Sequence, residues 1–91
     1  MSVFDKPVVK RTLGERVARA EQAMRLLESP MLIEARDSAE HKILLAWRDG
    51  KTPEERERAW AARGSLDLLQ RELKIIVQDG EHARVSMERE K

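Results

Sequence analysis

Apolar residues recur at alternating steps of three and four along most of this 91-residue chain. The longest run is Ala59, Ala62, Leu66, Leu69, Leu73 and Ile76. Two earlier runs also advance by three or four residues: Leu13, Val17, Ala20, Met24 and Leu27, and then Leu32, Ala35, Ala39, Ile43 and Ala46. Steps of three and four place side chains on one face of an α-helix. The pattern therefore predicts an all-α fold of three amphipathic helices.

Each run begins at a residue that favours a helix start. Thr12 is followed by Glu15 in the spacing of a capping box, and Ser29 is a favoured N-cap that precedes a proline. Thr52 also precedes a proline, which is well placed as the first residue of a helix. We expect helices over 13–28 and from residue 30, meeting at a corner or a kink, and a third helix from residue 53.

Two Asp-Gly pairs are expected to end helices. Glycine adopts the left-handed C-cap conformation without a Cβ clash, so Gly50 and Gly80 are predicted to stop the second and third helices. The second helix is therefore expected over about 30–48 and the third over about 53–78.

The short connection between these two helices predicts an antiparallel helical hairpin. Its expected seam pairs Leu32, Ala35, Ala39 and Ile43 with Ala59, Ala62, Leu66 and Leu69. The expected organisation is a flexible basic arm over 1–11, a three-helix domain over 12–80 and a charged tail over 81–91. Apolar residues off the main stripe exceed what one hairpin covers, so we expect an oligomer or a partner protein.

Composition limits the classes of function. The formal net charge is +1, which gives no overall attraction to nucleic acid or membrane. Cysteine is absent, which excludes disulfides and thiolate metal sites. No run approaches the 18 or so apolar residues of a membrane span, and residues 1–12 do not resemble a secretion signal. The expected location by default is the cytoplasm.

The sequence contains no arrangement that predicts catalysis. His41 and His82 lie in different elements with no metal-ligand spacing, and we interpret both as solvated. The serines lie in no nucleophile elbow, and the four glycines are isolated. We therefore expect a protein that is not an enzyme and that has no metal or other cofactor.

Five residues are candidates for partner binding: Trp47, Trp60, Gly64, Leu68 and Ile75. The tryptophans flank the predicted turn, and we expect them to pack over it as a cap on the core; the alternative is an exposed anchor. For Gly64, close helix packing is the favoured explanation, and a partner seated against the glycine is the alternative.

Nucleic-acid binding is the main alternative function. Five basic residues gather in the arm and the first helix: Lys6, Lys10, Arg11, Arg16 and Arg19. Such a cluster could hold a phosphate backbone weakly. An ordinary charged arm is the favoured interpretation.

Four segments resemble a group of small helical proteins that tailed bacteriophages encode among their structural genes. They are residues 23–32, with Leu26-Leu27-Glu28-Ser29-Pro30, residues 46–48, with Ala46-Trp47, residues 53–60, and residues 73–80, with Asp79-Gly80. The resemblance spans residues 20–83 and implies a protein of the virion or of its assembly. It implies no catalytic or ligand-binding residue.

The leading hypothesis is a non-enzymatic, phage-type structural or assembly protein. Its hairpin would self-associate or dock to a virion component. The alternatives are a packaging or regulatory module that binds nucleic acid through residues 6–19, and a small inhibitor that binds a host protein.

Overall fold

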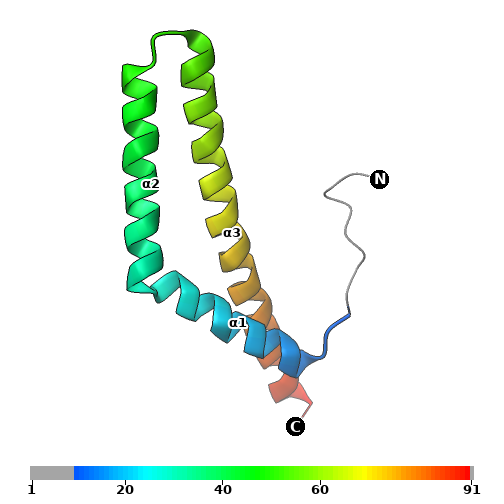
Figure 1. The fold of residues 1–91 in the computed structure, drawn as a ribbon. Coiled ribbons are helices and arrows are strands. Elements are labelled where there is room, and N and C mark those ends of the chain that lie inside the picture. Colours follow the sequence, from blue (N-terminus) through cyan, green and yellow to red (C-terminus); the bar gives the residue numbers. More distant parts are fainter. Residues whose placement is uncertain (1–9, 91) are drawn as a thin grey trace.

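The computed structural model describes residues 10–90, which form three α-helices and no strand (Figure 1). Helix α1 spans Leu13–Glu28, α2 spans Pro30–Asp49 and α3 spans Pro53–Arg89. The all-α prediction is confirmed, and the bounds of α1 and α2 match the expected ones to within a residue. The expected arm over 1–11 lies almost entirely outside the described residues.

The three predicted helix starts are confirmed by their hydrogen bonds. The Thr12 hydroxyl accepts from the amide of Glu15 at 3.1 Å, and the Thr52 hydroxyl accepts from the amide of Glu55 at 3.2 Å. The Glu55 carboxylate in turn accepts from the amide of Lys51 at 2.7 Å. Ser29 caps α2 over a longer distance, 3.5 Å to the amide of Leu32. These side chains satisfy amides that a helix start leaves without partners.

The predicted end of the third helix is wrong. Helix α3 does not stop at Gly80 but continues to Arg89, so it has 37 residues and a length of about 55 Å. Gly80 has no left-handed conformation and lies inside the helix. Residues 81–89, expected to be a charged tail, are the last turns of α3 and include the buried Ala83.

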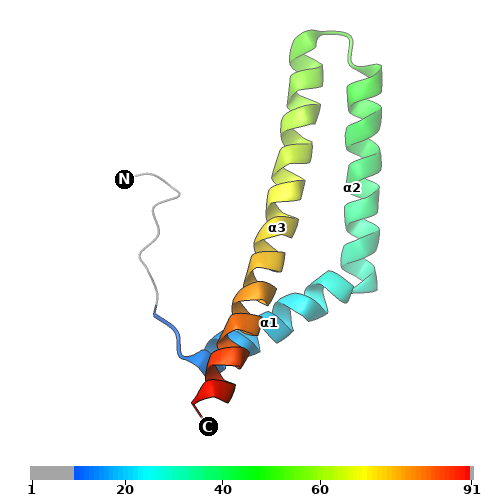
Figure 2. The same ribbon diagram turned by 180° about the vertical axis from the view of Figure 1, so that it is seen from behind.

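The three helices form an elongated frame rather than a bundle. Helices α2 and α3 run side by side in opposite directions from the connection at residues 50–52, and α1 leaves α2 at a sharp corner at Ser29. Helix α1 then crosses the C-terminal half of α3 (Figure 2). The radius of gyration is 17.7 Å, whereas a globular chain of this length has about 12 Å.

Gly80 allows α1 and α3 to cross at close range. A Cβ atom at Gly80 would collide with the Cβ of Ala20 and would lie 3.3 Å from the Arg16 carbonyl oxygen. Ala20, Ala23 and Ala83 are buried as well. The second Asp-Gly pair therefore serves tertiary packing instead of ending a helix.

Gly50 does end α2, but by a different mechanism from the one expected. Its φ is −62°, outside the left-handed region. A Cβ there would lie 3.0 Å from the Cγ of Arg56 and 3.1 Å from the carbonyl oxygen of Ala46. Glycine suits this position because a larger side chain would crowd Arg56 and the Ala46 carbonyl group.

Very little of the chain is buried. The buried hydrophobic residues of the described part are four alanines, Ala20, Ala23, Ala59 and Ala83. Along the expected seam, Ala35, Ala62 and Leu69 are exposed, while Leu32, Ala39, Ile43 and Leu66 are half-buried. The large apolar side chains therefore remain at least partly in water.

Candidate interaction groove between α2 and α3

A groove of about 560 Å³ opens between α2 and the first turns of α3. Its lining residues are Asp37, Glu40, His41, Ile43, Leu44, Trp47, Ala59, Trp60 and Arg63. Ala59 is buried at its floor, and Leu44 is 57% exposed at its wall. A small buried residue at the floor and an exposed leucine at the wall leave the groove open to solvent.

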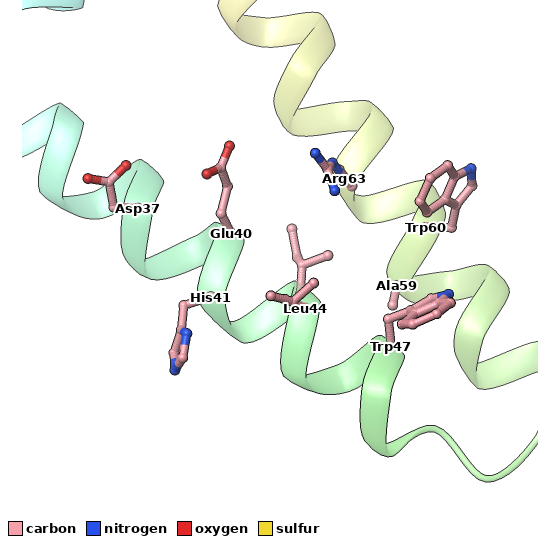
Figure 3. Close-up of a pocket in the computed structure, with 9 residues that line it drawn as sticks. Asp37, Glu40, His41, Leu44, Trp47, Ala59, Trp60 and Arg63 are labelled. Atoms are coloured by element: carbon pink, nitrogen blue, oxygen red, sulfur yellow. The ribbon is translucent and has the colours of Figure 1, made fainter.

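Both tryptophans belong to this groove and are exposed. Trp47 is 48% exposed and Trp60 is 67% exposed. The expectation that they cap the core over the turn is therefore wrong, and the structure fits the alternative of an exposed pair. Trp47 comes from the last turns of α2 and Trp60 from the first turns of α3, and Figure 3 shows both indoles extending away from the helix axes at one end of the groove. An exposed pair of indoles is a common anchor in protein interfaces.

The two walls of the groove carry opposite charges. Asp37 and Glu40 stand on the α2 wall, and Arg63 stands on the α3 wall at the level of Glu40 (Figure 3). The ion pairs found among residues 10–90 do not join Glu40 to Arg63. His41 also lines the groove, but its ring points away from the tryptophans.

The other three partner-binding candidates lie outside the groove. Gly64, Leu68 and Ile75 fall within about 80° of Trp60 around α3, so they form a neighbouring strip along the helix. Leu68 is 47% exposed and Ile75 is 46% exposed. A Cβ added at Gly64 would meet no atom within 4 Å, so packing inside the chain does not explain this glycine.

A second, smaller hollow lies where the three helices enclose a triangle. Leu27 of α1, Leu32 of α2 and Leu73 of α3 are among its lining residues. Arg36 lines it too, and its Nε atom is buried without a hydrogen-bond partner in the described part. Arg36 could not be predicted from the sequence, because the helical pattern assigns only apolar residues to the inner face.

One of the basic residues proposed for nucleic-acid binding, Arg16, forms an ion pair within the fold. Arg16 donates from Nη2 to a carboxylate oxygen of Asp79 at 2.7 Å and from Nε to the other oxygen at 3.0 Å. This pair joins α1 to α3 across 63 positions of sequence, and no local signal could have indicated it. Lys10 and Arg11 are exposed and Arg19 is half-buried, while Lys6 lies outside the described residues. Arg16 is thus engaged in the fold.

The same contact shifts the ionisation of the acid. Hydrogen bonding to the Arg16 guanidinium lowers the pKa of Asp79 below its ordinary value, against the smaller opposing effect of partial burial. The charges of Arg16, Arg19 and His82 lower this pKa further. Asp79 is therefore a carboxylate at neutral pH, and the α1–α3 crossing contains a bidentate ion pair.

Residues 10–90 contain no group of three or more acidic or histidine side chains placed to hold a metal ion. Over the same range, no helix is both long and apolar enough to cross a bilayer. No protein-family model, curated protein or solved structure matches this chain.

Proposed function

We propose that this chain is a non-enzymatic assembly protein that acts through helix-mediated self-association. One observation carries the proposal: within residues 10–90, no large apolar side chain is buried. Twelve are exposed, namely Met24, Leu26, Met31, Ile33, Leu44, Trp47, Trp60, Leu68, Leu69, Ile75, Val85 and Met87.

The energetics of folding give this observation its weight. Ordering a residue costs on the order of 1–2 kcal/mol of backbone entropy, which a folded domain offsets chiefly by burying apolar surface. Buried alanines supply little of that surface. Exposed apolar side chains in this number are typical of a chain whose core is completed by another protein surface.

The resemblance to small helical phage proteins supports a role in particle assembly, in a host cell or in the virion. The groove's polar residues are Asp37, Glu40, His41 and Arg63, and none of the hydrogen bonds found among residues 10–90 joins two of them as a nucleophile and its base would be joined. Docking to a virion component is the second form that this function could take.

The nucleic-acid alternative has less support than the sequence suggested. Arg16 is held by Asp79, and its release for a phosphate would break the ion pair between α1 and α3. The other candidates that lie within residues 10–90 are Lys10, Arg11 and Arg19. Salt-dependent binding to duplex DNA, reduced by K10A and R11A, would favour this alternative.

Sedimentation equilibrium of the purified chain over a wide concentration range tests the proposal. We expect a reversible dimer or higher oligomer at micromolar concentration. A compact monomer that remains monomeric at hundreds of micromolar would contradict self-association. A monomer that instead captures a host protein would support the inhibitor alternative.

A further inference from the structure

We propose that the occupant of the α2–α3 groove is the same groove of a second copy, in a parallel two-fold dimer. Helix α2 of each copy lies over α3 of the other, and both turns lie at the same end of a four-helix bundle. This inference rests on the proposed self-association and specifies the face and the orientation.

The groove face is free of the chain's own first helix. Trp60 and Gly80 are 20 residues apart in one continuous helix, so they point in directions that differ by about 200° around α3. Gly80 faces Ala20 of α1. Helix α1 therefore covers the side of α3 opposite to Trp60, and a second copy can approach the groove without displacing it.

The charges of the groove favour the second copy as its occupant. A two-fold axis parallel to the helices places the α2 wall of one copy over the α3 wall of the other. Glu40 then meets Arg63 of the second copy, and the same pair forms again by symmetry. A single groove thus carries both halves of the Glu40–Arg63 pair, while Asp37 is already paired with Arg36 of its own chain.

The same charges select the orientation. A two-fold axis across the helices would place α2 on α2 and α3 on α3. Centred on this groove, it brings Glu40 towards Glu40 and Arg63 towards Arg63, and like charges at an interface are unfavourable. The parallel arrangement replaces both repulsions with attractions.

The available area suits a stable dimer. Helix α2 has 20 residues and runs for about 30 Å, and two adjacent helices present a width of about 20 Å. The footprint is about 600 Å² per copy, close to the roughly 800 Å² per partner of a standard interface. Trp47 and Trp60 would lie within this footprint, at the end nearest the turn.

Charge reversal tests the pairing. E40R and R63E should each weaken self-association by about tenfold or more, because each variant places like charges opposite one another twice. An equimolar mixture of the two variants should form a heterodimer whose dissociation constant lies within about threefold of the native one. The double variant E40R/R63E should recover similarly. Sedimentation equilibrium measures all four samples, and circular dichroism checks that each is folded.

A matched control separates this pairing from a general effect of charge. Glu34 lies on the same helix about 120° away from Glu40, so E34R should leave the dissociation constant unchanged. If both single variants associated as tightly as the native chain, the groove-to-groove pairing would be overturned, but the proposed self-association would still stand. Weakened single variants that the mixture does not rescue would overturn it too, since they would indicate a pair within one chain. A native chain that is monomeric throughout would instead remove the proposed function itself.

The orientation has its own test, because the chain contains no cysteine. A single spin label on K51C, in the exposed turn, reports the distance between the two turns of a dimer. We expect about 10–20 Å, the spacing of adjacent helices plus the label arms. A distance of about 30 Å or more, the length of α2, would overturn the parallel arrangement.

Discussion

At the scale of single residues, two glycines of α3 have opposite roles. Gly80 lies against Ala20, whereas the space beside Gly64 is open. We expect G80A to lower the free energy of unfolding by about 1–3 kcal/mol, the usual cost of forcing extra volume into a tight contact. Urea denaturation at fixed protein concentration measures the change. The exchange A20G/G80A should recover part of the loss, because the methyl group moves to the other helix.

G64A provides the matched control in the same helix. Alanine favours helix formation over glycine by about 0.5–1 kcal/mol, and no atom obstructs its Cβ here. G64A should therefore stabilise the fold by that amount. Equal effects of G80A and G64A would mean that the crossing of α1 and α3 is looser than the structure describes.

The Arg16–Asp79 pair predicts a pH dependence. The pKa of Asp79 is lowered in the folded state, so its contribution to stability is complete above the unfolded pKa of about 3.9 and is lost as pH falls through the folded pKa. D79N should therefore melt at a lower temperature than the native chain from pH 7 to about pH 5. That difference should shrink as the pH falls below about 4. Thermal unfolding followed by circular dichroism across this range measures it.

Asp67 supplies the comparison for this experiment. It is exposed on the same helix and takes part in no ion pair found among residues 10–90. We expect no difference in melting temperature between D67N and the native chain that disappears at low pH. A D79N difference that stayed constant down to pH 2 would mean that the carboxylate charge contributes nothing to the crossing.

At the scale of helices, the sequence located starts better than ends. Thr12, Ser29 and Thr52 act on amides three residues away, so the information lies within one turn of helix. Gly80 followed the same Asp-Gly pattern as Gly50, yet it lies within a helix because α1 packs against it. The outcome at Gly80 depends on Ala20, 60 positions earlier, and no local pattern includes that residue.

The candidate site was predictable in part for the same reason. The two tryptophans could be identified as a pair from their positions beside the turn. Their exposure could not be predicted, because it depends on the distance between α2 and α3. Glu40 and Arg63 look like ordinary surface charges in the sequence, and only the groove brings them to one level.

The extra length of α3 yields a prediction at this scale. Residues 81–89 carry Ala83, which is 0% exposed, and Arg84, whose Nη2 lies 3.8 Å from Glu21 of α1. Deleting residues 81–91 should destabilise the packing of α1 by about 1–3 kcal/mol. The helical signal should fall by more than the deleted residues account for, because α1 frays too. Deleting only residues 90–91 is the control. Unchanged stability after the longer deletion would restore the interpretation of this segment as a tail.

At the scale of the whole molecule, the only tryptophans of the chain report on association. Both line the groove and both are more than two-fifths exposed. Self-association through the groove should move their fluorescence to shorter wavelength as concentration rises, since the indoles leave water. Emission spectra of a dilution series measure the shift, and E40R at equal concentration should stay at longer wavelength. Constant emission over a range where sedimentation shows association would place the contact surface elsewhere.

The unbroken helix α3 has a consequence for changes of chain length. The Trp60 groove and the Gly80 crossing are 20 residues apart, about 30 Å along the helix and about 200° around it. Inserting or deleting one residue between them would shift that phase by about 100° and turn the groove towards α1 or away from it. Inserting seven residues would change the phase by only about 20° while lengthening the frame by about 10 Å. This stretch of α3 should therefore accept many substitutions but few changes in length, apart from whole heptads.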